Sequence, residues 1–119
     1  MTQGPIRRVL VVEDEAMVAM LIQDLLAEIG CEVVLVASTA REAADMALTC
    51  DVDFALLDVN LGRGQTSFQA ATILGQRRTP FIWVTGYGRD GVPERFSAAP
   101  VLSKPIDPHL LADVVRNIG

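Results

Sequence analysis

Apolar runs of strand length alternate with segments of helical period along the chain, and this alternation limits the possible folds most strongly. The strand-like runs are residues 7–12, 31–37, 53–57, 81–85 and about 99–103. They are rich in β-branched residues and nearly free of polar interruptions, which is typical of strands buried on both faces. Strands of this kind that alternate with helices predict a parallel sheet between helical layers. We therefore expect an α/β fold, a doubly wound five-stranded parallel sheet, in one domain over residues 1–119.

Helical patterns fill most of the connections. The first helix is predicted to end at Gly30, and its apolar face is formed by Val18, Leu21, Ile22, Leu25, Leu26 and Ile29. A second helix over 39–49 opens with a capping-box pattern, and a third is expected over about 66–76. The last helix begins at Pro108, a residue that favours the first helical turn.

The connection between the fourth and fifth strands does not follow this pattern. Gly86, Gly88, Gly91 and Pro93 fall where a helix would be needed. Each glycine costs a helix ~1 kcal/mol and an interior proline ~3 kcal/mol. We expect a mobile loop with at most a turn or two of helix near 93–97, so that the fourth helix is short or degenerate.

Charge and composition exclude several classes of function. The net charge is −5 and the isoelectric point about 4.7, and no basic stripe is present that could bind nucleic acid or an anionic membrane. Cys31 and Cys50 match no metal or redox spacing and are expected to be reduced, half-buried thiols. No signal peptide and no apolar stretch of the ~20 residues that a membrane helix needs is visible. These features predict a soluble cytoplasmic protein.

Polar residues stand at the ends of four of the predicted strands. Glu13 and Asp14 follow the first strand, Asp58 follows the third, Thr85 closes the fourth and Lys104 follows the fifth. Each has an ordinary explanation alone, as a helix cap, a turn former, a strand residue or a solvated charge. Ligands of open α/β sheets bind beyond the carboxyl ends of the strands, so the joint occurrence favours a site.

The chemistry of these residues indicates a cation and a phosphoryl group. Two carboxylates ~4 Å apart repel by about 4 kcal/mol at an effective dielectric constant of 20. A divalent cation would relieve this repulsion, and an all-oxygen ligand set suits Mg²⁺ better than Zn²⁺. Asp58 is then the candidate nucleophile, Lys104 a second cation and Thr85 a hydroxyl donor for phosphoryl transfer.

Four motifs together resemble the receiver domain of two-component response regulators, a CheY-like family. The resemblance covers essentially the whole chain and is carried by VVEDE (11–15), LLDVNL (56–61), VTGYG (84–88) and LSKP (102–105). It implies the strand order 2-1-3-4-5. It also implies phosphorylation by a histidine kinase or a histidine phosphotransferase, with no enzymatic activity beyond the protein's own phosphorylation and dephosphorylation.

The resemblance assigns a role to each site residue. It implies that Glu13, Asp14 and Asp58 bind Mg²⁺ together with the backbone carbonyl of Asn60. It implies that Asp58 accepts the phosphoryl group and that Thr85 and Lys104 contact it.

One position departs from the usual receiver pattern. Receivers typically carry Tyr or Phe three residues before the lysine, and this chain has Val101 there. The stretch PFIWVTGYG (80–88) is similar to the FAT GUY subgroup of stand-alone receivers, although Trp83 and Val84 replace its Phe and Ala. A valine cannot signal through an aromatic rotamer, so the usual description of the switch does not apply.

We expect the glycine-rich loop 86–93 to take over the switch. When a phosphoryl group draws Thr85 inward, the following residues can rearrange because little helix holds them, and Tyr87 is the candidate moving side chain. The alternative is that Tyr87 only packs on the loop. In receivers, the positions of Asn60 and Tyr87 flank the path of the attacking water, so Tyr87 is also expected to influence dephosphorylation.

Other enzyme classes fit the sequence less well. Residues 86–91 spell the GxGxxG pattern of dinucleotide-binding proteins, with Asp107 as the following acid, but Pro93 stands where its helix must run. A phosphatase of the haloacid-dehalogenase type needs a second acid where this chain has Asn60. A flavodoxin-like binder lacks its Ser/Thr-rich loop after the first strand.

The remaining alternative is a pseudo-receiver that binds proteins without being phosphorylated. We expect a monomeric, stand-alone receiver without an output domain, which acts by protein contact or as a phosphoryl relay or sink. His109 is expected at the surface of the last helix rather than in a relay. Neither nucleic acid nor membrane is an expected partner.

Overall fold

A five-stranded parallel sheet in the order β2-β1-β3-β4-β5 forms the centre of the computed structural model, which describes residues 6–118. The predicted fold and strand order are therefore confirmed. The strands are β1 (Arg7–Val12), β2 (Cys31–Ala37), β3 (Phe54–Asp58), β4 (Phe81–Thr85) and β5 (Val101–Ser103). All four neighbouring pairs are parallel, so the carboxyl ends of the strands meet at one edge of the sheet.

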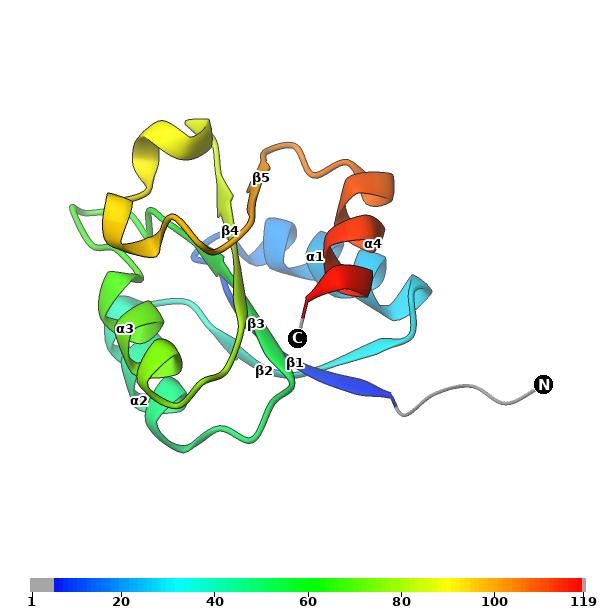
Figure 1. Cartoon of the computed structure of the whole chain (residues 1–119), viewed down its shortest axis with the longest axis horizontal. Helices are drawn as coiled ribbons and strands as arrows, with labels where there is room; N and C mark the ends of the chain where they lie inside the picture. The colour runs from blue at the N-terminus through cyan, green and yellow to red at the C-terminus, as the bar shows by residue number, and fades with distance from the viewer. Residues whose placement is uncertain (1–5, 119) are drawn as a thin grey trace.

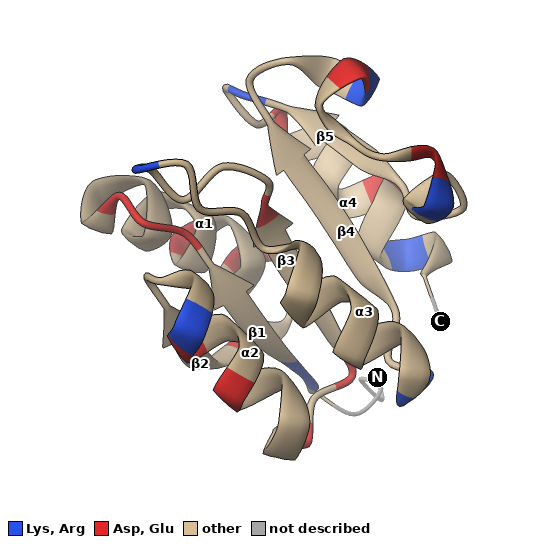
Figure 2. Cartoon of the chain, turned by 90° about the vertical axis from the view of Figure 1, so that its left-hand side faces the viewer, with Lys and Arg blue, Asp and Glu red and all other residues tan. Residues whose placement is uncertain are grey.

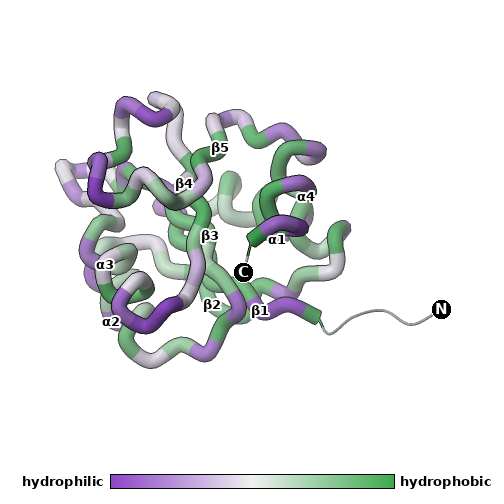
Figure 3. The backbone as a smooth tube through the Cα atoms, viewed as in Figure 1, coloured by the Kyte–Doolittle hydropathy of each residue, from purple (hydrophilic) through white to green (hydrophobic). Residues whose placement is uncertain are grey.

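Helices cover both faces of the sheet. They are α1 (Ala16–Glu28), α2 (Ala40–Thr49), α3 (Phe68–Gln76) and α4 (Pro108–Asn117). Figure 1 shows α1 and α4 on one side and α2 and α3 on the other. Alternate residues of β1 pack into the two layers, with Val9 and Val11 toward α1 and α4, and Leu10 and Val12 toward α2 and α3. The strands form the most hydrophobic part of the chain trace (Figure 3).

Side chains cap the N-termini of α2 and α4. The Thr39 hydroxyl accepts a hydrogen bond from the Glu42 N–H at 3.1 Å, and the Asp107 carboxylate accepts one from the His109 N–H at 2.8 Å. These bonds satisfy N–H groups that have no partner within the helix, which defines where α2 and α4 begin. No helix among residues 6–118 is long and apolar enough to cross a membrane.

Two details of burial differ from the sequence prediction. The buried stripe of α1 is narrower than its apolar pattern suggested, because Leu21 is 52% exposed and Ile29 37% exposed. Cys31 and Cys50 are buried free thiols rather than half-buried ones, because each packs into one of the two core layers.

The β4–β5 connection contains two single 3₁₀ turns, η1 (Gly88–Gly91) and η2 (Glu94–Phe96), in place of a helix. This agrees with the predicted degenerate fourth helix. Phe96 holds the connection to the protein because its ring packs against Trp83 and Phe68, with centroids 5.4 and 5.9 Å away.

Candidate functional site

Three carboxylates lie together at the carboxyl edge of the sheet. Glu13 directly follows β1, Asp58 is the last residue of β3, and Asp14 begins the connection to α1. One oxygen atom of each lies within 4.8 Å of the other two. Glu13 and Asp58 are only 1% and 6% exposed, whereas Asp14 is exposed to solvent. The sequence-predicted acidic residues thus form one cluster with an open side.

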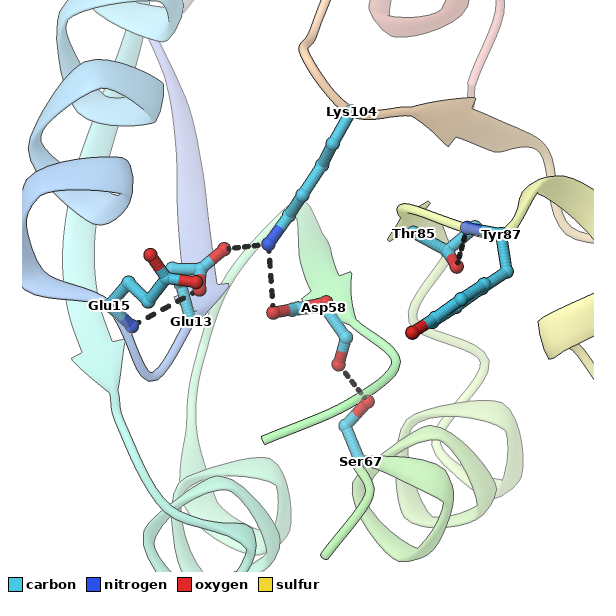
Figure 4. Close-up of polar contacts among 7 residues, drawn as sticks. All are labelled: Glu13, Glu15, Asp58, Ser67, Thr85, Tyr87 and Lys104. Atoms are coloured by element: carbon cyan, nitrogen blue, oxygen red, sulfur yellow. Dashed lines mark hydrogen bonds and ion pairs between the residues drawn. The ribbon is translucent and has the colours of Figure 1, made fainter. Parts of the chain in front are cut away.

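The Lys104 ammonium group lies between two of these carboxylates. Its Nζ is 2.9 Å from Glu13 Oε1 and 3.0 Å from Asp58 Oδ2, as Figure 4 shows. The backbone places Lys104 here because its N–H donates to the Thr85 carbonyl at 3.0 Å, which continues the β4–β5 pairing past Ser103. The lysine thereby compensates part of the negative charge of the cluster.

The environment changes the acidity of all three groups. Burial raises the pKa of Glu13 to about 7, although the ion pair with Lys104 and the N–H of Glu15 favour the ionised form. Burial also raises the pKa of Asp58, against the opposing effect of Lys104. Burial disfavours the charged form of Lys104, but its contacts with Glu13 and Asp58 outweigh this and raise its pKa. The lysine therefore remains charged, while the buried carboxyl groups hold protons more readily than exposed ones do.

Ser67 fixes the backbone of Asp58, a role that the sequence did not suggest. Its buried hydroxyl donates to the Asp58 carbonyl at 2.6 Å, while the Val59 N–H donates to the Val84 carbonyl at 3.1 Å. The hydroxyl is therefore not used as a cap of α3, although Ser67 occupies the N-cap position. The only signal in the sequence was a serine just before a helix, which normally predicts a cap.

The segment after Asp58 lies against the acidic cluster. Asn60 pairs with Thr66 in an isolated antiparallel bridge, which closes a tight turn at 61–65. A Cβ added to Gly62 would lie 3.4 Å from Asp14 Oδ2. Within residues 6–118, no donor forms a hydrogen bond to the Asn60 carbonyl, which leaves this oxygen available to a ligand.

Thr85 and Tyr87 lie on the opposite side of Asp58 from Glu13. The buried Thr85 hydroxyl accepts a hydrogen bond from the Tyr87 N–H at 3.0 Å, and Tyr87 is 70% exposed. Figure 4 shows the Tyr87 hydroxyl directed back toward Asp58. Thr85 makes no hydrogen bond to Asp58 in the described chain. The Thr85 hydroxyl thus lies beside the acidic cluster but is hydrogen-bonded to the loop that follows β4.

Val101 and His109 lie away from the cluster. Val101 pairs with Trp83 in the sheet and packs into the layer beneath α2 and α3. His109 is exposed in the first turn of α4, as the sequence predicted. Neither side chain contributes to the acidic site.

The donor set suits a hard divalent cation such as Mg²⁺. It offers the three carboxylates, so that all of its ligand atoms are oxygen. Asp14 is exposed, so the side on which a cation and a phosphoryl oxygen would meet remains accessible. Asp58 belongs to the same cluster and keeps a small exposed fraction, as a nucleophile needs.

The comparisons with known proteins agree with this arrangement. Residues 9–116 match the family model of the response regulator receiver domain. SdrG of Sphingomonas melonis Fr1 superposes with a TM-score of 0.83 and 33% identity, covering 96% of this chain and 97% of SdrG. PhyR of Bartonella quintana superposes with a TM-score of 0.78 and 26% identity, covering 95% of this chain and 47% of PhyR.

A curated relative gives the same family. The transcriptional regulatory protein PdtaR of Mycobacterium tuberculosis H37Rv is 30% identical over 112 residues, which are 94% of this chain and 55% of PdtaR. This chain thus spans about half the length of that relative. On the basis of the family match, the strand order and the shared sequence, the chain belongs to the family of response regulator receiver domains.

Proposed function

We propose that this protein is the phosphoacceptor of a two-component phosphorelay, with Asp58 as the residue that is phosphorylated in a Mg²⁺-dependent reaction. The observation that carries the proposal is the convergence of Asp58 with Glu13, Asp14 and Lys104 at one edge of the sheet. The donor would be a phosphohistidine of a histidine kinase or a histidine phosphotransferase. Apart from this transfer and the hydrolysis of the resulting aspartyl phosphate to inorganic phosphate, we propose no enzymatic activity.

The chain's own groups can support the transfer. An Asp58 carboxylate oxygen attacks the phosphorus atom, the phosphorus–nitrogen bond of the donor breaks, and the imidazole leaves with the bonding electrons. Mg²⁺, when bound to Glu13, Asp14, Asp58 and the Asn60 carbonyl, would neutralise charge on the phosphoryl oxygens. Lys104 Nζ lies 3.0 Å from Asp58 Oδ2, so it is positioned to pair with the negative charge that phosphorylation adds. The Thr85 hydroxyl can donate a hydrogen bond to the phosphoryl group once it no longer accepts one from the Tyr87 N–H.

Output through protein contact follows from the same proposal. A phosphorylated Asp58 biases the protein between two conformations, and a partner that prefers one of them reads the signal. The similar protein from Bartonella quintana, PhyR, is an anti-anti-sigma factor, a name that implies output through protein contact. We infer the same mode of output here, with the loop that contains η1 and η2 as the moving part.

A phosphorylation-independent binding module is the second candidate. Lys104 already forms ion pairs with both buried carboxylates, so the folded site is partly compensated before any cation binds. A pseudo-receiver would exploit this compensated state and present a fixed surface to its partner.

Acetyl phosphate with Mg²⁺ separates the two candidates. The proposal predicts that intact-mass spectrometry detects one added phosphoryl group on the wild type and none on Asp58→Asn, whose amide cannot act as the nucleophile. Asp53→Asn is the matched control, because Asp53 is exposed at the opposite edge of the sheet and should leave the reaction unchanged. An unmodified wild type would support the binding module. Modification of Asp58→Asn to the same extent as Asp53→Asn would exclude Asp58 as the acceptor.

A further inference from the structure

The sheet face that carries α2 and α3 is incompletely covered beside β4 and β5. In a parallel sheet, the crossover between two strands usually supplies a helix that packs on the sheet. Between β4 and β5 the chain supplies only η1 and η2, and Phe96 is the single buried side chain of these two turns. The space next to α3 that a full helix would occupy is therefore only partly filled.

A mostly apolar groove of about 610 Å³ occupies this space. It lies between α3, the start of β4 and the segment that leads into β5, and its principal lining residues are Thr72, Gly75, Phe81, Arg95, Ala99 and Pro100. A second hollow of about 390 Å³ shares Ala98, Pro100 and Ile118 with it and extends it to α4. The two hollows form an elongated depression from α3 to α4, as a rod-shaped ligand requires.

Among the described residues that line the larger groove, Arg95 alone is charged. Its guanidinium lies over the Phe96 ring, 4.7 Å from the centroid, and 5.9 Å from that of Phe68. No carboxylate among residues 6–118 is within ion-pair distance of it. Figure 2 shows basic and acidic residues next to each other on the turns between β4 and β5. A cation at the edge of an apolar groove is complementary to a partner with a carboxylate beside an apolar surface.

The shape of the site favours a helix over an added strand. The free edge of β5 is only three residues long, and Pro100 before it has no N–H to offer a pairing strand. On the α3 side, Ala71 and Gly75 are small, which allows the backbone of a second helix to approach closely.

We propose that this groove binds an amphipathic α-helix of another protein, whose apolar stripe packs on α3 and Phe81 and whose carboxylate pairs with Arg95. The bound helix takes the position in the layer that the β4–β5 crossover leaves open. The inference rests on the groove alone and needs no phosphorylation of Asp58. If the groove does not bind a helix, the proposed phosphorylation of Asp58 is unaffected. If Asp58 is not phosphorylated, the proposed helix binding is likewise unaffected.

A synthetic helix tests the proposal on the unmodified protein. The probe is an alanine-based, end-capped peptide of about four turns, with leucines at i, i+3 and i+7 and a glutamate beside this stripe. Titration of the ¹⁵N-labelled protein is expected to shift the amide signals of α3, Phe81 and residues 95–100. Arg95→Glu should weaken binding about fivefold, the size of an exposed ion pair. A peptide with lysine in place of glutamate should restore the affinity.

Filling the groove provides a variant that keeps the fold. No atom lies within 4 Å of a Cβ built on Gly75, and leucine is a far better helix former than glycine. Gly75→Leu is therefore expected to fold and to abolish peptide binding. Gln69→Leu adds the same side chain at an exposed position of α3 that does not line the groove, and should bind the peptide like the wild type.

Several results would overturn the proposal. These are the absence of shifts at millimolar peptide, shifts centred on the exposed Met17 and Met20 of α1, and equal affinity in Gly75→Leu and wild type. Shifts of the groove signals with protein concentration alone would assign the surface to a second copy of this chain instead.

Discussion

At the scale of single residues, Glu13 shows how burial prepares the site for a cation. Burial raises the pKa of this carboxyl group to about 7, above its ordinary value of 4.5. In the metal-free protein this shift contributes stability that is complete below pH 4.5 and is lost as the pH rises through about 7. A divalent cation needs the ionised carboxylate, so its binding must displace the proton.

The affinity for Mg²⁺ should consequently depend on pH. A group with a pKa near 7 is about ten times more ionised at pH 8 than at pH 6, so binding should be about tenfold tighter at pH 8. Isothermal titration calorimetry at the two pH values measures this. Glu13→Gln should bind more weakly and lose most of the pH dependence. An affinity of the wild type that does not change between these pH values would contradict the assigned role of Glu13.

Tyr87 makes a separate prediction about the lifetime of the phosphorylated state. Its exposed side chain reaches back toward Asp58, where it can limit the access of water (Figure 4). Tyr87→Ala should therefore lose its phosphoryl group severalfold faster than the wild type, as followed by intact mass over time. Tyr87→Phe keeps the ring and should remain close to the wild type. Equal lifetimes of the alanine variant and the wild type would show that the ring does not shield the site.

The sequence predicted which acidic side chains would meet because the ends of parallel strands meet at one edge. Glu13, Asp14 and Asp58 were identifiable for this reason alone. It could not predict that Lys104 would lie between Glu13 and Asp58, because a lysine side chain has several rotatable bonds and reaches many positions. Ser67 was missed since a serine before a helix normally caps it, and its actual acceptor lies nine residues earlier in the chain.

At the scale of elements, the connection of residues 86–100 differs most from its neighbours. The strands and the capped helices were predictable from apolar periodicity and from local capping residues. The exposure of Leu21 on α1 could not be predicted in this way. Apolar periodicity shows which face of a helix is directed toward the core, but not how much of that face the neighbouring elements cover. The glycines and Pro93 predicted a weak fourth helix, but the packing of Phe96 on Trp83 depends on tertiary contacts.

This connection should respond to activation more than any other element. Its short 3₁₀ turns hold it with few backbone hydrogen bonds, and Thr85 connects it to the site through the Tyr87 N–H. Beryllofluoride with Mg²⁺, a mimic of the phosphoryl group, should change amide hydrogen exchange at 86–98. The exchange of α4 should change little and is the internal control. Unchanged exchange at 86–98 would exclude this segment as the switch.

At the scale of the whole molecule, Arg7 connects the first strand to the end of the last helix. Its guanidinium donates to the carbonyls of Val115 and Ile118 at 2.6 and 2.9 Å. It also lies 5.0 Å from the centroid of the Phe54 ring. The last carbonyls of a helix have no partner within it, so this residue both caps α4 and joins it to the sheet.

Arg7→Lys should therefore destabilise the protein although it preserves the charge. A lysine cannot reach two carbonyls with a planar fork or stack on the ring in the same way. We expect the free energy of unfolding to fall by about 1–2 kcal/mol in urea denaturation. Arg8→Lys is the matched control at an exposed neighbouring position and should stay within about 0.5 kcal/mol of the wild type. Equal losses in both variants would contradict the role of Arg7.

The fold as a whole brings a cation site and a nucleophile to the same edge of the sheet, and the Mg²⁺ dependence of phosphorylation tests this most directly. The initial rate of modification by acetyl phosphate should rise with Mg²⁺ and saturate in the wild type. In Asp14→Asn, which removes one exposed ligand charge without disturbing the buried pair, half-saturation should need about tenfold more Mg²⁺. A wild-type rate that is independent of Mg²⁺, or equal half-saturation in the two proteins, would contradict the assignment of the acidic cluster.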